Sequence, residues 1–484
     1  MSGNIHFALP RNSINRRAML QSGGGMTAMA LAHLMAGKSD AAIDQALSPS
    51  PPHRQSKATS VIWIFTNGGP SQVDTWDYKP ELIKRDGQEL PGFDNKTGFF
   101  VDQVGPLMKS PFKWQQHGQS GTYVPEIFPY LARHVDDMAF IHSMHTETNN
   151  HSPALFQINT GMSRMGFPCV GSWVVYGLGS ESSNLPAFMV MVDTLGRGLP
   201  KGHASNWSSG FLPGVYQGTA LNTQGSPIDN LNPSATLQAG DQRRQLDLLA
   251  KMNANHLVSH ANNAELAARM ESFELAFRMQ SAAPEAFDLS RESKSIHHMY
   301  GTENPRCSHV ARQTLAARRL VERGVRFVQI YSGGMENERS WDGHSDIESN
   351  HRQFAGETDQ PVAALLADLK NRGMLDSTLV IWGGEFGRLP VAQRSKNTNA
   401  KGRDHNPHAF TIWMAGGGVK GGFHHGATDL FGHKAEQDKV SVNDFHATIL
   451  HLLGMDHTKL TFRYSGRQFR LTDVAGNVVT PILA

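Results

Sequence analysis

Short runs of β-branched and aromatic residues recur along the chain, and each is followed by a turn signal or a polar segment. The first, residues 61–65, reads Val-Ile-Trp-Ile-Phe and ends at Asn67-Gly68-Gly69-Pro70. A continuous apolar run of this length, closed by Gly and Pro, is typical of a strand buried on both faces. We therefore predict strands here and at five similar runs: residues 138–141, 187–192, 325–330, 378–382 and 410–415.

Helical patterns lie between several of these runs. Residues 246–279 carry apolar side chains at helical spacing with little Gly or Pro, which predicts two long helices. Residues 361–372 and 442–453 predict one helix each, the second with Asn443 or Asp444 as its cap. Strands that alternate with helices indicate an α/β fold, with a mostly parallel sheet and helices on both of its faces.

Polar side chains suited to metal binding or proton transfer are concentrated near the ends of the predicted strands. In a parallel α/β sheet the carboxyl ends of the strands lie along one edge, where ligands bind. We expect Asp74 and Asp77 to cap a helix or to contact Lys79. The polar clusters expected to converge on one rim are residues 67–74; His142, His145, Asn150 and His151; residues 341–344; residues 384–388; and residues 404–408, which precede the last run.

The N-terminal part of the chain has the order of an export signal. Arg16 and Arg17 precede a weakly apolar, Gly/Ala/Met-rich stretch that is too short to form a stable membrane anchor. The arginine pair, with Leu20 three residues later, resembles a twin-arginine signal; an amphipathic N-terminal helix is the alternative. We expect a signal peptide over residues 1–45, export to the periplasm by the twin-arginine machinery, and a disordered linker over residues 46–57.

The overall composition narrows the classes of partner and of site. The chain has 484 residues, of which 39% are hydrophobic and 18% charged, and its net charge of +2 gives no reason to expect a nucleic acid or an anionic membrane as partner. Histidine is abundant, with 24 residues against 2 cysteines, which favours a His/Asp metal site over a thiolate site. Cys169 and Cys307 lie far apart in the sequence, and both one disulfide and two free thiols remain open.

Several motifs occur together in this chain: residues 61–80, Trp341-Asp342-x-His344, Glu385-Phe386-Gly387-Arg388, Gly402-Arg403-Asp404-His405-x-Pro407 and the glycine-rich residues 416–422. Together they resemble the DUF1501 family, and the similarity covers nearly the whole chain after the signal. The family is a branch of the alkaline phosphatase superfamily, which also contains sulfatases, phosphatases and cofactor-independent phosphoglycerate mutases. The resemblance implies an alkaline phosphatase/sulfatase-like domain over residues 58–484, with a mostly helical insertion at residues 236–320.

The resemblance also implies where a nucleophile and metal ligands would lie. Superfamily enzymes have an Asp ligand after the first strand, where this chain has Asn67. They have a nucleophile at a helix start before a Thr-Gly pair, where this chain has His151 with Ser152 beside it. The Cys-x-Pro-x-Arg element that sulfatases convert to formylglycine is absent from this sequence.

The usual Asp-His-Gly element of the superfamily reads Glu385-Phe386-Gly387 here, so that one histidine ligand is lost. The resemblance therefore implies one intact metal position and one degraded position. Imidazole and carboxylate ligands suit Zn²⁺ or Mn²⁺, with Ca²⁺ or Mg²⁺ as further possibilities. The remaining ligand candidates are Asp342, His344, Glu385, Asn67, and His405 or His408.

Two kinds of function fit these residues. In a metal-dependent hydrolase of phosphate or sulfate esters, His151 would be a nucleophile or a general base, Ser152 the alternative nucleophile, and Arg388 a clamp for an anionic oxygen. In a non-catalytic binding protein for anionic or sulfated glycans, the same fold would keep a degraded site. Asp342 with His344, and Glu385 with Arg388, also have purely structural interpretations as a hydrogen-bonded pair and an internal ion pair.

Overall fold

The computed structural model describes residues 47–90, 92–94, 96–221, 228, 240–259, 264–394 and 401–484. The expected signal peptide lies outside these residues. Within them, no helix is both long and apolar enough to span a bilayer. Cys169 and Cys307 are both buried free thiols, so they do not form the disulfide that the sequence left open.

A nine-stranded sheet forms the centre of the described structure, in the order β14-β5-β13-β9-β1-β8-β6-β7, with β17 paired to β5. All of its pairings are parallel except those of β13. All six predicted strands are confirmed. The strands are β1 (Ser60–Thr66), β5 (Met138–His145), β6 (Phe188–Met191), β7 (Thr219–Leu221), β8 (Phe327–Ser332), β9 (Thr378–Gly383), β13 (Phe410–Ala415), β14 (Phe423–His425) and β17 (Val440–Ser441).

The reversed direction of β13 decides where the polar clusters meet. Trp413 on β13 pairs with Trp382 on β9 and with Phe140 on β5, antiparallel in both cases. The start of β13 therefore lies at the edge of the sheet where β1, β5, β8 and β9 end. For this reason residues 404–408, which precede β13, can join the clusters that follow the other strands.

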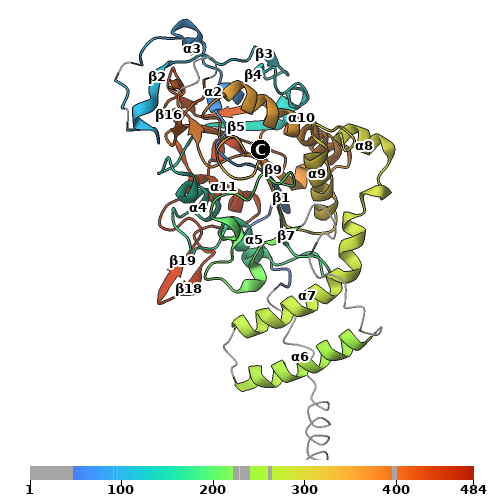
Figure 1. Cartoon of the computed structure of the whole chain (residues 1–484). Helices are drawn as coiled ribbons and strands as arrows, with labels where there is room; N and C mark the ends of the chain where they lie inside the picture. Colours follow the sequence, from blue (N-terminus) through green and yellow to red (C-terminus); the bar gives the residue numbers. More distant parts are fainter. Residues whose placement is uncertain are drawn as a thin grey trace, which may run out of the picture.

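Helices cover both faces of the sheet (Figure 1). Ile62 and Ile64 of β1 point into one core, with α8 (Lys294–Tyr300), α9 (Ser308–Val321) and α10 (Ile347–Asn371). The alternate residues Val61, Trp63 and Phe65 point into the opposite core. This second core is closed by α4 (His151–Thr160), α5 (Val170–Leu178) and α11 (Val442–Leu452).

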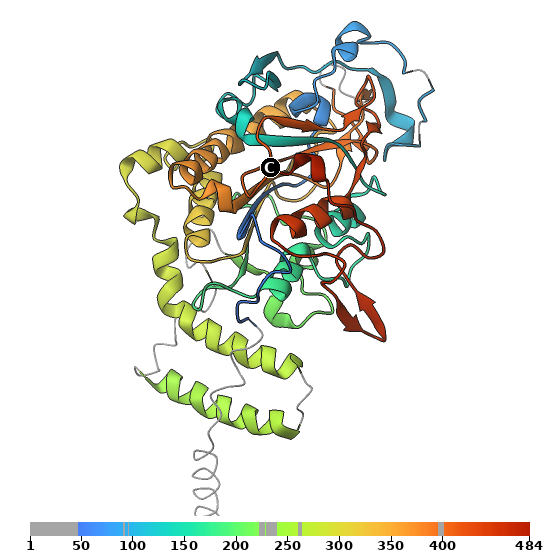
Figure 2. The ribbon, with the colours of Figure 1, turned by 180° about the vertical axis from the view of Figure 1, so that it is seen from behind.

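Two long helices project away from the sheet, as both views of the ribbon show (Figures 1 and 2). They are α6 (Asp241–Ser259) and α7 (Ala264–Phe287), and they confirm the two long helices predicted over residues 246–279. Together with α8 and α9 they place a helical segment between β7 and β8.

Three local predictions need correction. The helix predicted from residue 361 begins at Ile347, and Pro361 lies inside it. The cap of α11 is Ser441, whose hydroxyl accepts from the Asp444 amide while the Asp444 carboxylate accepts from the Ser441 amide. The expected disordered linker is instead irregular chain held to the domain, because the amides of Ser50 and Arg54 donate to the carbonyls of Leu178 and Gly454.

Smaller elements complete the described chain. They are α2 (Gln72–Thr75), α3 (Pro80–Lys84), η1 (Val101–Gln103), β2 (Val104–Leu107), β3 (Trp114–His117), β4 (Thr122–Pro125), η2 (Leu131–Asp137), η3 (His203–Trp207), η4 (Gly214–Tyr216), η5 (Leu289–Arg291), η6 (Leu375–Ser377), β10 (Gly387–Arg388), β11 (Val391–Gln393), β12 (His405–Asn406), β15 (Ala427–Thr428), β16 (Ala435–Gln437), β18 (Phe462–Tyr464), β19 (Arg467–Phe469) and η7 (Thr480–Ile482).

Candidate metal centre

Four side chains from three separate parts of the sequence meet at the edge where the strands end. His151 is the first residue of α4, which Asn150 caps through its side chain directly after β5. Asp342 and His344 lie in the loop after β8, and His405 lies on β12 just before β13. One ligand atom from each of the four residues lies within 4.8 Å of the others.

The contacts within this cluster are short, and three of its four residues are buried. The Nε2 atom of His344 lies 2.9 Å from Asp342 Oδ1 and 2.9 Å from His405 Nε2. His405 Nε2 lies 3.2 Å from Asp342 Oδ1, and His151 Nε2 lies 3.2 Å from Asp342 Oδ2. Only 6% of His151, 1% of Asp342 and 3% of His405 is exposed.

The outer ring nitrogens fix the tautomer of all three histidines. Each Nδ1 faces an oxygen that can only accept a hydrogen bond, so that each Nδ1 carries a proton and Nε2 is the atom of each neutral ring whose lone pair faces the centre. The Nδ1 acceptors are Glu385 Oε1 for His151 at 2.8 Å, Gln393 Oε1 for His344 at 2.7 Å, and the Asn149 main-chain oxygen for His405 at 2.6 Å.

This donor set fits a divalent metal ion. Two imidazole lone pairs repel each other at 2.9 Å unless a cation lies between them. For Zn²⁺ with bonds of 2.0–2.1 Å, the edge of the tetrahedron of ligands is about 3.3–3.4 Å, close to the contacts in the cluster. His151 Nε2 is buried without a hydrogen-bond partner of good geometry among the described residues. Three imidazoles and one carboxylate can therefore hold one ion.

The electrostatics of the site act in opposite directions on two of the histidines. Burial, with the positive charges of His151 and Arg388 nearby, holds the pKa of His405 well below its usual value, which keeps the ring neutral and able to ligate. Burial disfavours the charged form of His151, but Asp342 and Glu385 outweigh it and raise the pKa of His151 to about 9. A proton and a metal ion therefore compete for the Nε2 atom of His151.

Asp342 is held as a carboxylate by the residues around it. Although burial opposes ionisation, Arg388 and His151 keep the pKa of Asp342 well below its usual range. The Arg388 Nη2 atom lies 2.5 Å from Asp342 Oδ1, and the Asn337 amide donates to Asp342 Oδ2 at 2.6 Å. The pairing of Arg388 with His405 between β10 and β12 brings this guanidinium to the cluster.

Arg388 is occupied inside the protein rather than directed at a substrate. Its side chain is completely buried, and it donates to the main-chain oxygens of Gly69 at 2.8 Å, of Arg403 at 3.1 Å, and of Gly68, in addition to Asp342. The geometry thus differs from the expected anion clamp: the guanidinium balances the charge of Asp342 and ties the turn after β1 to β10.

The other candidates occupy different places. Glu385 is fully buried and accepts from His151 and from the Gly68 amide at 3.0 Å, which makes it a partner of a ligand rather than a member of the cluster. His408 is exposed and faces His433, outside the cluster. The Ser152 amide is engaged by the cap residue Asn150.

Asn67 lies directly after β1, and one of its side-chain atoms is unpaired within the described part of the chain. Its side-chain nitrogen donates to the Gly334 main-chain oxygen, while its Oδ1 atom is buried without a hydrogen-bond partner among the described residues. Its main-chain oxygen accepts from the Trp341 amide at 2.9 Å, which fastens the loop that carries Asp342 to the end of β1.

Several supporting residues were not identified from the sequence. Gln393 and the Asn149 main-chain oxygen orient two ligands, and Asp404 Oδ1 accepts from the His405 amide at 2.7 Å. Asp74 was expected to cap a helix or to contact Lys79, but it forms a buried ion pair with Arg403 at 2.6 Å. For Arg403 and Asp404, their position directly before His405 in the sequence was the only signal of a supporting role.

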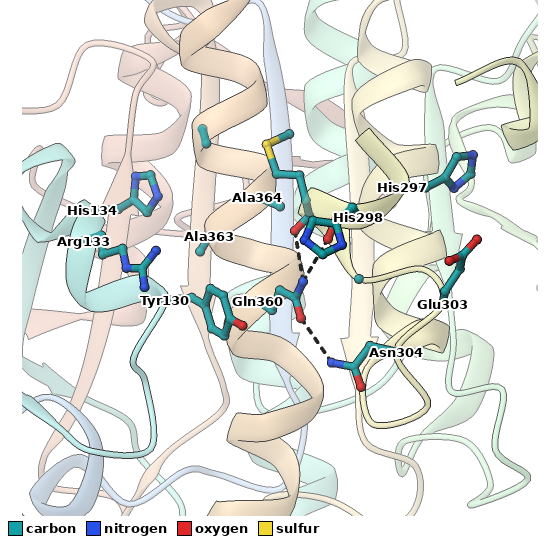
Figure 3. A pocket seen from close by; sticks show the side chains of 13 residues that line it. Tyr130, Arg133, His134, His297, His298, Glu303, Asn304, Gln360, Ala363 and Ala364 are labelled. Atoms are coloured by element: carbon teal, nitrogen blue, oxygen red, sulfur yellow. Dashed lines mark hydrogen bonds between the residues drawn. The ribbon is translucent and has the colours of Figure 1, made fainter. Parts of the chain in front are cut away.

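A large groove lies elsewhere, on the face of the sheet covered by α8 and α10 (Figure 3). Its volume is about 590 Å³, and it contains none of the candidate site residues. Arg133 and His134 line one side and His298 and Glu303 the other, over the alanines of α10. The groove is therefore separate from the metal centre.

Comparisons with known proteins concern the fold and the family. An alkaline phosphatase from the Antarctic bacterium TAB5 is 10% identical with a TM-score of 0.30, over 75% of this chain and 92% of that chain. A sulfatase from Pseudoalteromonas sp. is 12% identical with a TM-score of 0.35, over 82% and 68%. A phosphonate monoester hydrolase from Silicibacter pomeroyi is 12% identical with a TM-score of 0.31, over 89% and 76%.

At these TM-scores the assignment of chemistry rests on the residues of this chain alone. No curated protein matches the sequence. The family model described as "Protein of unknown function (DUF1501)" matches residues 58–483, and the chain belongs to this family.

Proposed function

We propose that the protein is a metal-dependent hydrolase of phosphate or sulfate esters, exported to the periplasm by the twin-arginine machinery. The observation that carries the proposal is the convergence of three imidazole Nε2 atoms and the Asp342 carboxylate at one site, with each Nδ1 atom already engaged by an outer acceptor. Imidazole and carboxylate ligands favour Zn²⁺ or Mn²⁺ over Ca²⁺ and Mg²⁺, which prefer oxygen ligands. The substrate would be a small-molecule or glycan ester.

A bound Zn²⁺ or Mn²⁺ ion would act as a Lewis acid on a phosphoryl or sulfuryl oxygen and would lower the pKa of a water molecule. Asp342, His344 and His405 are the proposed permanent ligands. His151 is the remaining member, oriented by Glu385 at 2.8 Å, and its role is either that of a fourth ligand or that of a nucleophile or general base. Ser152, next to it on α4, remains the alternative nucleophile.

The first test is the metal content of the purified protein, measured by elemental analysis in the wild type and in Asp342→Ala and His405→Ala. We expect one Zn or Mn per chain in the wild type and a loss of metal in both variants. His408→Ala is the matched control, because His408 is an exposed histidine outside the cluster, and it should keep the metal. Absence of metal from the wild type would refute the proposal.

The second test separates the roles of His151 and detects the activity. The metal-loaded protein is assayed with aryl phosphates, aryl sulfates and phosphodiesters. If His151 is a base or nucleophile, His151→Ala keeps its metal and loses turnover; if it is a ligand, the variant loses both. A metal-loaded wild type that hydrolyses none of these esters would contradict the hydrolase function.

A second candidate is a non-catalytic binding protein for anionic or sulfated glycans. Two features favour it: four protein ligands are enough to complete a tetrahedral site, as in structural zinc centres, and the donors of Arg388 are used inside the protein. This function predicts bound metal and glycan binding without turnover in the wild type, and loss of the metal in His151→Ala because the variant lacks the fourth ligand.

A further inference from the structure

Residues 97–103 form a strap across the candidate metal centre. The ring of Phe99 lies 5.7 Å from the ring of His405, and the ring of Phe100 meets the ring of His344 edge-on at 5.1 Å. The ring of Phe99 also contacts that of Phe100 at 5.1 Å. Phe99 is 46% exposed although its ring contacts that of the buried His405, so part of this residue faces solvent beside the centre.

Asn149 connects this strap to one metal-ligand candidate. Its main-chain oxygen accepts from His405 Nδ1 at 2.6 Å. Its side-chain nitrogen donates to the main-chain oxygens of Thr97 at 3.1 Å and of Gly98 at 2.9 Å. One residue therefore orients a histidine through its backbone and holds the strap through its side chain.

Two more residues make the same kind of double contact. Gln393 accepts from His344 Nδ1 at 2.7 Å and donates to Gln103 Oε1 at 2.8 Å. Asp404 accepts from the His405 amide at 2.7 Å and, through Oδ2, from the Phe100 amide at 2.6 Å.

The approach of the strap to Asp404 is close enough to require glycine. A Cβ atom at position 98 would lie 2.3 Å from Asp404 Oδ2, so Gly98 allows the strap to reach this carboxylate. With three connections of the same design, the position of the strap and the orientation of two ligand candidates are one linked structure.

We infer that the strap is the substrate-facing wall of the metal centre and that Phe99 selects esters whose alcohol part carries a ring, such as an aryl group or a pyranose. This inference rests on the proposed function. Three of the four cluster residues are buried, so the strap has to shift to admit an ester, and Phe99 is an aromatic side chain beside the cluster that is also exposed to solvent. A flat ring or the C–H face of a sugar packs favourably against an aromatic ring, whereas a methyl ester offers little to contact.

The first experiment measures the connection between strap and metal by limited digestion with trypsin. Lys96 directly precedes the strap, and cleavage after it reports opening of this segment. We expect cleavage there to be about 5-fold or more faster in chelator-treated wild type than in protein reloaded with one equivalent of Zn²⁺, because the ligand histidines no longer hold their partners in place. Cleavage after Lys459, which is exposed far along the chain, is the internal control and should not change.

Asn149→Ala separates the two contacts of this residue, because the main-chain oxygen for His405 is retained and only the side-chain connection is lost. The variant should keep its metal and show fast cleavage after Lys96 even when loaded. Equal cleavage of loaded and chelated wild type, or slow cleavage of the loaded variant, would overturn the connection. None of these measurements requires turnover, so a failure of the hydrolase function would be seen separately.

The second experiment tests Phe99 with ligands that are not hydrolysed. Binding of phenylphosphonate and methylphosphonate, and of the corresponding sulfonates, to Zn-loaded protein is measured by calorimetry. Phe99→Ala should weaken binding of the phenyl compound about 2- to 12-fold and leave the methyl compound and the metal content unchanged. Tyr464→Ala, which removes an exposed aromatic ring on β18, is the matched control. An equal loss for both compounds, no loss for either, or no binding of either by the wild type would overturn the role of Phe99.

Discussion

The strongest test of the packing around the site is removal of the guanidinium of Arg403. Arg403 and Asp74 are both completely buried, and Arg403 Nε lies 2.6 Å from Asp74 Oδ2. The other guanidinium nitrogens donate to Asp74 Oδ1 at 3.2 Å and to the main-chain oxygens of Leu389 at 3.2 Å and Met108 at 2.9 Å. The variant Arg403→Met keeps an unbranched apolar side chain of similar length and removes all four contacts.

The magnitude follows from what the substitution leaves behind. Asp74 would remain buried with only the Ser71 hydroxyl, at 2.5 Å, among its present side-chain partners, and two buried carbonyls would lose a donor. Breaking a buried ion pair in this way costs about 3–5 kcal/mol of unfolding free energy. The double variant Asp74→Asn/Arg403→Met has no unpaired charge, so its cost should fall to about 1–3 kcal/mol.

The assay is urea unfolding followed by tryptophan fluorescence, with the unfolding free energy of each variant compared with that of the wild type. The control is Arg352→Met, which removes an ion pair with Glu126 and Glu348 in which Arg352 is 42% exposed, and it should cost at most about 1 kcal/mol. If Arg403→Met costs no more than this control, or if Asp74→Asn does not recover stability, the reasoning about the buried pair is refuted.

Three further predictions concern pH, backbone conformation and export. His351 accepts from the Ser71 amide at 2.9 Å, and burial lowers its pKa to about 3. Below about pH 6.5 the unfolded chain takes up a proton on this histidine and the folded chain does not, so the unfolding free energy should decrease by several kcal/mol as pH falls from about 6.5 toward 4. The urea midpoint of His351→Gln should depend less on pH than that of the wild type. Gly68→Ala should lower stability by about 1–3 kcal/mol and reduce metal content, because φ is +104° there and the added Cβ would lie 2.7 Å from the Asp342 amide; unchanged melting and metal content would contradict this. Replacing the arginine pair at positions 16–17 by two lysines should retain the full-length protein inside the cell, and export at the wild-type level in cell fractionation would exclude the twin-arginine route.

The strands and several helices could be predicted because their signals are local. The run at residues 61–65 is apolar at every position, and the structure buries β1 on both faces. The start of α10 could not be predicted from such a local signal. Pro361 is a good first residue of a helix, but here it is an internal residue, since the helix begins far upstream, where the Asp346 side chain caps it by accepting from the Ser349 amide.

In the candidate site, too, some features could be predicted from the sequence and others could not. Asp342, His344 and His405 were identified from motifs because metals need a small set of residue types, and strand ends are where such residues gather. The roles of Glu385 and Arg388 could not be predicted from the sequence, because a carboxylate can bind a metal or orient a histidine, and a guanidinium can bind a substrate or a buried Asp. Only the positions of their neighbours distinguish these cases.

The sequence by itself therefore determined the strand and helix types, the α/β class, the family and the edge of the sheet where chemistry gathers, since these depend on local periodicity and on residue type. The tertiary structure alone decided which histidine nitrogens point inward, that a main-chain oxygen of Asn149 orients His405, and that residues 97–103 lie across the centre. Backbone atoms are chemically the same at every position, so their partners follow only from how the elements pack in space.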